Sequence, residues 1–214
     1  PLLKNFDLPN YEDALGDEVL AFKKAFQVLM DFSDHESLDM GGRRIRLTEP
    51  INMQAAVKTR TSFSSRRVVR NGQFQVDPSS GWDTETVTSQ ATYSTSDPKA
   101  LTDVANAANI PVGALVEGTG VGREVYVAAV NVAQQRVTLT QSLYDAAGTQ
   151  NFTFKRFKYI LDFSGFDELS QFSLDSIDFH CSGIASAVML ARAGTIFHMK
   201  DCFITRPKDR GITS

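Results

Sequence analysis

The sequence is poor in cysteine and histidine and has no long apolar run. Its 214 residues include two cysteines and three histidines. Two cysteines are too few for a disulfide scaffold. No apolar segment approaches the roughly 18 residues that a membrane-spanning helix requires, which excludes such a helix. The first residues do not have the form of a signal peptide, and the chain opens with Pro1 rather than Met. We therefore expect its N-terminus to be trimmed.

An excess of positive charge is also missing. Lysine and arginine number 22 against 25 aspartates and glutamates, a formal net charge of −3. The arginines are scattered, and the pairs Arg43-Arg44 and Arg66-Arg67 are short enough to be solvated surface residues. The composition therefore gives no electrostatic basis for binding nucleic acid.

An internal repeat lies near the C-terminus. The apolar positions of Phe172–Phe179 recur 25 residues later in Phe197–Ile204. Each copy has two alternating apolar residues, a polar pair and two more alternating apolar residues, which predicts strand, bend and strand with one inward face. Repeats of 20–50 residues built from short strands indicate a solenoid, and a unit of about 25 suits one coil of a parallel β-helix. The chain ends at Ser214 without a third copy or cap, so we expect it to be a piece of a longer protein.

The same spacing occurs earlier in the chain. Val69–Phe74 matches the later copies and predicts an earlier coil, and Tyr159–Phe163 marks the resumption of the pattern.

In the repeat register Cys202 falls at the position of Ile177, so it is predicted to be a small buried hydrophobe. Cys181 falls at the position of Arg206 instead. Leu38–Ile51 reads as strand, Gly-Gly turn and strand.

The N-terminal region predicts one amphipathic helix. Residues 1–12, with Pro9, are expected to form an extended arm. Apolar residues at steps of three and four predict a helix from Asp13 to Met30 that covers a hydrophobic surface. Gly16 weakens its first turn, so the helix could instead start with Asp17 as its N-cap.

Between residues 78 and 157 the repeat disappears. Residues 79–98 are rich in Ser and Thr and could form a strand or a long loop, and residues 97–109 predict a short helical run. Val112–Phe154 predicts antiparallel hairpins with short turns, hence a compact β module inserted into the solenoid. Its expected strands are Ala114–Val116, Glu124–Val127, Arg136–Thr140 and Asn151–Phe154.

No cofactor or metal site is expected. Gly118-Thr-Gly120-Val-Gly122 fails as a nucleotide-binding loop in spacing, and a strand rather than a helix follows it, which favours turn glycines. The three histidines have no partner at metal-ligand spacing, which favours ordinary surface or turn positions; they are His35, His180 and His198.

No catalytic residue is expected either. A sugar-cleaving site needs two carboxylates at a defined separation, or a bound cation and a base. The acids around the later coils do not recur from coil to coil and are expected on the solvated outer face: Asp162, Asp167, Glu168, Asp175, Asp178 and Asp201. Aromatic residues could form a sugar-stacking platform, but filling the core is the favoured interpretation for Trp82, Tyr93, Phe157, Tyr159, Phe163 and Phe166.

Three parts of the chain together resemble a known family. They are the helix segment Asp17–Phe26, the segment from Leu38 to Ile51 with the pattern L-x-M-G-G-R-x-I-x-L-x-x-P-I, and the later coils. They resemble right-handed parallel β-helix proteins of the pectate-lyase-like superfamily, especially bacteriophage tailspikes. The resemblance covers most of residues 15–77 and 158–214. Val112–Phe154 is similar to small β modules of phage tail proteins. The N-T-D, D-D, G-H-G and R-I-K elements of polygalacturonase-type enzymes are absent, so no catalytic residue is carried over.

The resemblance implies a virion or extracellular spike that binds a bacterial surface polysaccharide. It also implies that the chain forms a homotrimer and that the helix caps the solenoid. The N-terminal side would contact other tail or baseplate proteins, and neither nucleic acid nor a membrane is an expected partner. The expected parts are an arm (1–12), capping helix and first coils (13–77), an inserted β module (78–157) and resumed coils (158–214). Two alternatives remain open. One is a secreted or virion-borne polysaccharide lyase or hydrolase with its active site beyond residue 214; the other is a structural baseplate or head-spike component.

Overall fold

A computed structural model describes residues 6–31 and 35–213, and its chain divides into two compact units. Unit 1 comprises Pro1–Trp82 with Lys158–Ser214, and unit 2 comprises Asp83–Phe157. Apart from helices near the N-terminus the structure is mostly β, with parallel sheets in unit 1 and an antiparallel sheet in unit 2. The break after Trp82 lies later than the expected boundary at residue 78, because the Trp82 side chain is buried in the core of unit 1.

Two helices precede the first strand. α1 (Leu8–Leu15) begins after Asp7, whose carboxylate accepts a hydrogen bond from the Asn10 amide at 3.2 Å, and ends at Gly16 with φ of 69°. The expectation of an extended arm is therefore wrong for residues 8–12. Pro9 lies in the first turn, where a helix loses no hydrogen bond to proline. Residues 1–5 of that expected arm lie outside the described residues.

α2 (Glu18–Asp31) confirms the helix that covers a hydrophobic surface, and it starts at the second of the two expected positions. The Asp17 carboxylate accepts a hydrogen bond from the Leu20 amide at 2.8 Å. The rings of Phe22 and Phe26 are fully buried against the parallel sheet, Phe22 edge-on to Phe74 with 5.2 Å between centroids. None of the described helices has the length and apolar character needed to cross a membrane.

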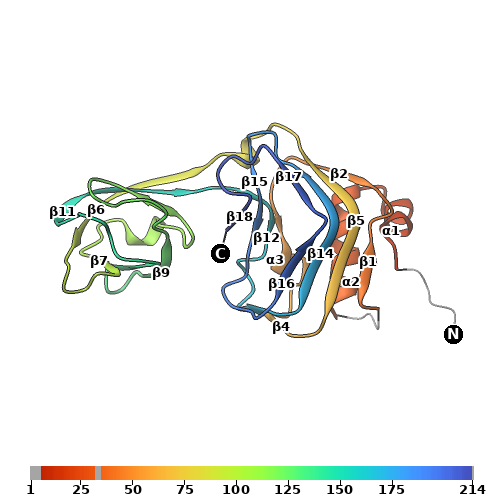
Figure 1. Ribbon diagram of the computed structural model, residues 1–214, viewed down its shortest axis with the longest axis horizontal. Coiled ribbons are helices and arrows are strands. Elements are labelled where there is room, and N and C mark those ends of the chain that lie inside the picture. Colours follow the sequence, from red (N-terminus) through yellow and green to blue (C-terminus); the bar gives the residue numbers. More distant parts are fainter. Residues whose placement is uncertain (1–5, 32–34, 214) are drawn as a thin grey trace. The chain divides into compact units, whose positions relative to one another are not determined.

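Unit 1 contains a parallel sheet, here sheet A, that confirms the 25-residue repeat (Figure 1). Its central strands are β5 (Arg67–Val76) and β14 (Phe172–His180), which pair with Val69 beside Leu174. On the far side of β14, Leu174 pairs with Met199. The remaining strands are β1 (Ser37–Asp39) and β2 (Arg44–Leu47) beside β5, with β16 (Phe197–Lys200) and β17 (Phe203–Thr205) beside β14.

The bend inside each repeat has a defined backbone conformation. Asn71, Ser176 and Asp201 take left-handed conformations, with φ of 57°, 56° and 50°. They occupy equivalent positions, because their neighbours pair as Arg70 with Asp175 and Asp175 with Lys200. The strand, bend and strand pattern is therefore confirmed, with β14 running unbroken through its bend and the last repeat divided into β16 and β17.

A second parallel sheet, sheet B, has the order β18-β15-β12-β3. Leu161 of β12 pairs with Ile51 on one side and Val188 on the other, which confirms that the pattern resumes after Lys158. The strands are β3 (Ile51–Asn52), β12 (Tyr159–Asp162), β15 (Ser186–Met189) and β18 (Ile212–Thr213); α3 (Met53–Val57) follows β3, and β4 (Ser62–Phe63) pairs in parallel with β13 (Glu168–Leu169).

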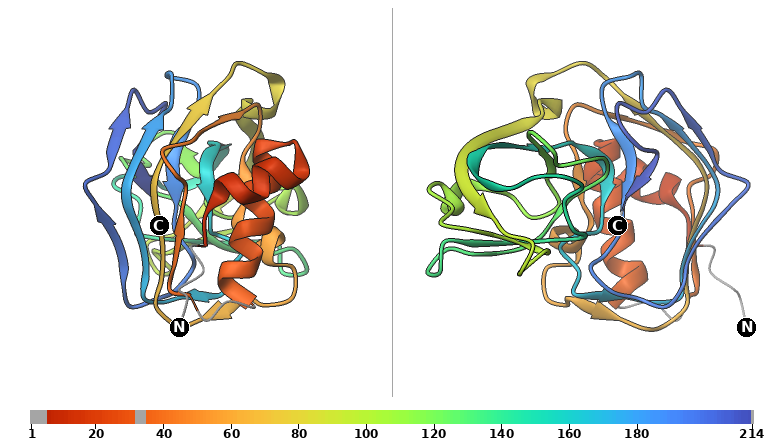
Figure 2. Two further views of the ribbon diagram at one scale, coloured as in Figure 1. Left: turned by 90° about the vertical axis from the view of Figure 1, so that its right-hand side faces the viewer. Right: turned by 60° about the vertical axis from the view of Figure 1, so that its left-hand side comes forward.

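The chain visits these sheets in a fixed order. From β2 in sheet A it passes to β3 in sheet B and then to β4; from β5 it passes, after unit 2, to β12 and then to β13. β14 leads to β15, and β17 leads to β18. An apolar cluster of described residues joins side chains of both sheets and of α2. The two views of Figure 2 show the strands of unit 1 following one another around its interior.

Unit 2 is an antiparallel sheet that closes on itself. Its order is β8-β11-β6-β7-β10-β9. The Val116 amide donates to the Val125 carbonyl at 2.8 Å and the Val127 amide donates to the Ala114 carbonyl at 2.9 Å, which joins β8 to the start of β9. The strands are β6 (Glu85–Tyr93), β7 (Ala100–Thr102), β8 (Leu115–Glu117), β9 (Val127–Asn131), β10 (Arg136–Leu139) and β11 (Gly148–Arg156).

The antiparallel hairpins expected over Val112–Phe154 are confirmed. For residues 79–98 the strand is the correct alternative, since β6 follows the short 3-10 turn Ser80–Trp82. The short helix expected over residues 97–109 is wrong. That segment forms β7, whose Leu101 is fully buried opposite Val137, and only a single 3-10 turn at Ala107–Asn109. Burial of Leu101 and Val137 together outweighs the weak helical preference of the Ala-rich segment.

Candidate functional site

The glycine-rich segment of unit 2 is a turn that holds a second loop. It connects β8 to β9, and Gly120 has φ of 71°. A Cβ at Gly120 would lie 2.4 Å from the Asp145 carbonyl oxygen, and the Asp145 amide donates to the Gly120 carbonyl at 2.8 Å. The prediction of turn glycines is confirmed. Their role is to allow a close approach of two loops.

That approach presents an aromatic side chain to solvent. The Tyr144 amide donates to the Val121 carbonyl at 3.2 Å, so its backbone is fixed, yet 87% of the Tyr144 side chain surface is exposed. Sequence reasoning missed Tyr144 as an exposed aromatic. No periodicity distinguishes it, and its exposure follows from contacts between two loops that are distant in the sequence.

The aromatic residues proposed from the sequence fill the cores instead. Trp82, Tyr93 and Tyr159 are at most 4% exposed, and Phe163 and Phe166 are fully buried. The Trp82 indole donates to the Asp77 carbonyl at 3.1 Å. Core filling is therefore confirmed for these five, which excludes them as a sugar-stacking platform, and Phe157 is only half-buried.

Asp175 and Asp178 lie on the outer face of sheet A, as expected, and Asp175 belongs to a row of alternating charge, whereas Asp162 and Glu168 lie on β12 and β13 outside this sheet. Asp39 pairs in register with Arg70, Arg70 with Asp175, and Asp175 with Lys200. Ion pairs follow this row: Arg70 Nε lies 3.3 Å from Asp39 Oδ2, and Lys200 Nζ lies 3.9 Å from Asp175 Oδ2. Asp178 stands instead between Gln73 and Phe203, so no ladder of acids forms.

The histidines are separate from one another. His35 stacks on Phe6, His180 Nδ1 lies 3.4 Å from the Thr205 hydroxyl, and His198 pairs in register with Ser173. Among residues 6–31 and 35–213, no group of three or more His, Cys, Asp or Glu side chains could hold a metal ion.

The two cysteines differ in burial. Cys181 is fully buried, and desolvation raises the pKa of its thiol to about 12. Cys202 lies beside Ile177 in the repeat as predicted, but it is only half-buried, and burial raises its pKa to a smaller degree. The prediction of a buried Cys202 is therefore wrong. β16 and β17, which flank Cys202, pair only with β14 among the described strands, so one side of this layer is uncovered.

A cleft in unit 1 brings several lysine and amide side chains together. It has a volume of about 650 Å³ and lies between α2, α3 and the segment before β3. A neighbouring hollow of about 300 Å³ shares Leu20, Lys23, Glu49 and Pro50 with it, so the two form one elongated depression. We call the larger part the lysine cleft. Its lining residues are Leu20, Lys23, Lys24, Gln27, Glu49, Pro50, Asn52, Ala55, Ala56, Lys58, Gly81 and Lys158.

The lysine cleft contrasts in charge with the rest of the chain. Four lysines and one glutamate line it, although acidic residues outnumber basic ones overall. Lys24 Nζ contacts only the Gln27 amide oxygen at 3.5 Å, and within the described part of the chain Lys23, Lys24 and Lys58 form no ion pair. Lys23 and Lys24 lie outside the buried stripe of α2. Nothing in the sequence indicated that Lys58 and Lys158 lie nearby.

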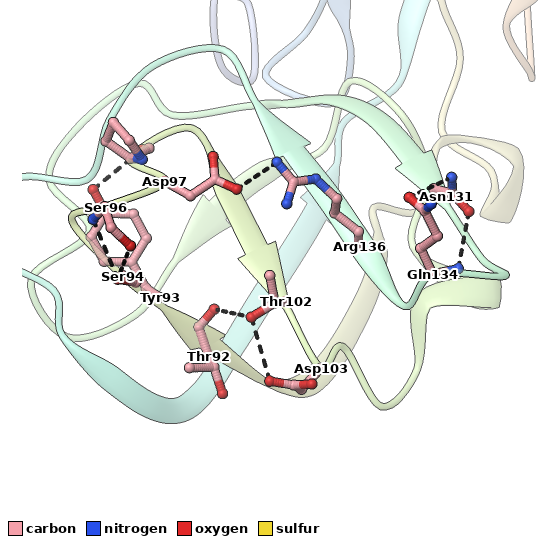
Figure 3. Close-up of polar contacts among 11 residues, drawn as sticks. Thr92, Tyr93, Ser94, Ser96, Asp97, Thr102, Asp103, Asn131, Gln134 and Arg136 are labelled. Atoms are coloured by element: carbon pink, nitrogen blue, oxygen red, sulfur yellow. Dashed lines mark hydrogen bonds and ion pairs between the residues drawn. The ribbon is translucent and has the colours of Figure 1, made fainter.

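Polar side chains on unit 2, by contrast, bond mostly to one another (Figure 3). Asp97 and Arg136 form an ion pair at 2.6 Å, and the Thr92 and Thr149 hydroxyls lie 2.8 Å apart across β6 and β11. The Thr102 hydroxyl donates to the Thr92 carbonyl at 3.5 Å. These contacts join neighbouring strands and turns of the closed sheet.

No family model matches the chain. No curated protein matches it either. Among solved structures, the chain is similar to the Gp54 tailspike of Acinetobacter baumannii bacteriophage AP22 in complex with A. baumannii capsular saccharide. The TM-score is 0.30 with 14% sequence identity, over 92% of this chain and 34% of that chain. This chain thus spans about a third of that tailspike's length. A likeness at this TM-score decides neither fold nor ligand, so the architecture rests on the strand pairings described above.

Proposed function

We propose that this chain is the N-terminal structural part of a virion spike that binds polysaccharide on a bacterial surface. The observation that carries the proposal is the repeated passage from sheet A to sheet B in register. This passage supports a parallel β-helix with about 25 residues per coil. Crossovers between parallel strands are right-handed in nearly all proteins, which supports a right-handed solenoid. α2 then serves as its cap, and unit 2 as an inserted module.

A solenoid suits a polysaccharide ligand for a geometric reason. Its coils repeat at the spacing of neighbouring strands, about 4.8 Å, and they present extended faces with rows of equivalent side chains. On sheet A one such row is Asp39, Arg70, Asp175 and Lys200. Acidic and basic side chains alternate along this row, so a glycan with a repeating unit can bond to charged groups at regular intervals along the face.

Adsorption to bacteria tests the proposal. Fluorescently labelled protein is added to a panel of capsulated strains and to a capsule-deficient derivative of each strain. We expect adsorption to at least one capsulated strain, loss of adsorption on its derivative, and competition by the isolated capsule. Equal adsorption to both members of every pair would contradict polysaccharide binding.

The assembly state is a separate part of the proposal. A spike built on this fold is expected to be a homotrimer, whose mass light scattering measures directly. A monomeric mass across the accessible concentration range would contradict the trimer and leave the polysaccharide proposal to the adsorption experiment.

A further inference from the structure

We infer that the lysine cleft binds a carboxylate-bearing oligosaccharide. The inference rests on the proposed function, because it names the chemical class of saccharide and the place on unit 1 that contacts it. The cleft lies on α2, α3 and the segments around them, away from the outer face of sheet A.

The first support is the clustering of positive charge on four lysines, three of which form no ion pair among the described residues. Lys23 and Lys24 come from α2, Lys58 from the end of α3, and Lys158 from the residue before β12. Bringing like charges together is unfavourable unless counter-charges are present. Among the described residues Lys23, Lys24 and Lys58 have no ion-pair partner, and Glu49 is the one carboxylate in the cleft lining, so most of the counter-charge is expected to come from outside the unit.

The second support is the backbone of Lys58. This residue has φ of 71° at the end of α3, and its amide donates to the Gln54 carbonyl at 3.0 Å. With ψ of −55° it lies outside the left-handed helical region, and the Thr59 amide donates to the Val57 carbonyl at 2.9 Å across it, as in a γ-turn of the strained kind. A non-glycine residue there carries strain, and such strain concentrates at functional sites. The strained backbone belongs to a lysine that lines the cleft.

The shape and lining of the cleft favour a sugar chain over a compact anion. Its volume of about 650 Å³ lies within the range of roughly 300–1,000 Å³ typical of ligand pockets. Lysines from separate elements line an elongated depression, and arginine, which suits bidentate phosphate recognition, does not contribute to its lining. Amide side chains can bond sugar hydroxyls, and small apolar side chains can pack on sugar C–H groups; they are Gln27 and Asn52, with Leu20, Pro50, Ala55 and Ala56.

The experiment compares a charged polymer with its neutral derivative. Binding of the full chain to polygalacturonate and to fully methyl-esterified polygalacturonate is measured by calorimetry at low salt. The two polymers share one backbone and differ in the carboxylate charge. We expect polygalacturonate to bind about tenfold more tightly, since several exposed ion pairs of modest strength add to such a difference. This preference should weaken as salt screens the charges.

Two triple variants locate the site. In the cleft variant Lys23→Glu, Lys24→Glu and Lys58→Glu reverse three charges, and affinity for polygalacturonate should fall about tenfold or more. In the control variant Lys99→Glu, Arg123→Glu and Lys208→Glu make the same change in net charge at exposed positions elsewhere, and affinity should fall much less. Circular dichroism and the emission of buried Trp82, the only tryptophan, check that both variants fold.

Several outcomes would overturn the inference. These are equal affinity for the two polymers, equal losses in the two variants, or no binding of polygalacturonate. Binding of inorganic tripolyphosphate at the cleft without binding of either polymer would show an anion site that does not take saccharide.

Adsorption of the cleft variant to capsulated bacteria separates the two proposals. If adsorption persists unchanged, the cleft inference fails and the proposed function stands; if the unaltered chain does not adsorb to any strain, the proposed function fails.

Discussion

The rings of Phe74 and Phe179 stack in the core of unit 1 with 5.6 Å between their centroids, although all of unit 2 lies between them in the sequence. The two residues are register partners on β5 and β14. Loop-closure entropy grows only slowly with loop length, so a long insertion between successive coils adds little to its cost. The coil before unit 2 and the coil after it therefore pack as direct neighbours.

Removing one ring of this stack should destabilise unit 1 strongly. Phe179 is fully buried, and Phe179→Ala is expected to lower the free energy of unfolding by about 3–5 kcal/mol through lost burial and a residual cavity. Denaturant unfolding followed by Trp82 emission measures the change. Phe203→Ala is the matched control, because Phe203 points outward from the same sheet and is 67% exposed. A similar loss in both variants would contradict the inward and outward assignment.

The left-handed bend should select against branched side chains. Ser176 has φ of 56°, and Ser176→Val is expected to cost about 1–3 kcal/mol because a β-branched residue fits this conformation poorly. Ser176→Gly should be close to neutral or stabilising. Ser173→Val, in an extended position of the same strand, is the control and should change stability by less than about 0.5 kcal/mol. Equal costs for valine at both positions would show that the bend is not formed.

The close approach of the two loops in unit 2 should make Gly120 intolerant of a side chain. In Gly120→Ala the new Cβ would meet the Asp145 carbonyl at 2.4 Å and would also occupy a left-handed residue. Gly148→Ala is matched in conformation, with φ of 66°, but its Cβ would meet nothing within 4 Å. Hydrogen exchange of unit 2 amides should therefore accelerate much more in Gly120→Ala, with unit 1 unchanged in both variants. Equal acceleration in both would refute the steric contact and leave only backbone strain.

The cysteines should differ in reactivity and in pH dependence. Burial raises both thiol pKa values, that of Cys181 to about 12, so less thiolate is present in the folded protein than in a free thiol at the same pH. Because thiolate is the reactive form, labelling of half-buried Cys202 should be slow at pH 7 and accelerate as pH rises toward its pKa. Cys181 should react only after unfolding. Mass spectrometry of the labelled peptides checks this order, which rapid labelling of Cys181 in the folded protein would contradict.

The sequence predicted the parts of the fold that depend on local pattern. Alternating apolar residues placed Leu174 beside both Val69 and Met199, and the Asp17 cap and the buried face of α2 followed from helical periodicity. The sequence does not predict the helical start at residues 8–12, because Pro9 suggests a break although it fits the first turn of a helix.

The candidate site could not be predicted in the same way. The lysine cleft brings together Lys23 and Lys24 with Lys58 and Lys158, which belong to different elements and share no sequence spacing. The exposure of Tyr144 likewise depends on contacts between two loops of unit 2. Both features arise from tertiary packing, on which local periodicity carries no information.

Excision of unit 2 tests most directly whether the coils stack independently of the insertion. Glu85 and Arg156 are direct cross-strand partners, so the chain ends there lie about 5 Å apart. Residues 87–154 are replaced by Asn-Gly, a two-residue turn that suits a hairpin. We expect cooperative unfolding and a Trp82 emission spectrum unchanged from the full chain, because Trp82 is buried within unit 1. A red-shifted Trp82 emission with loss of cooperative unfolding would contradict this expectation.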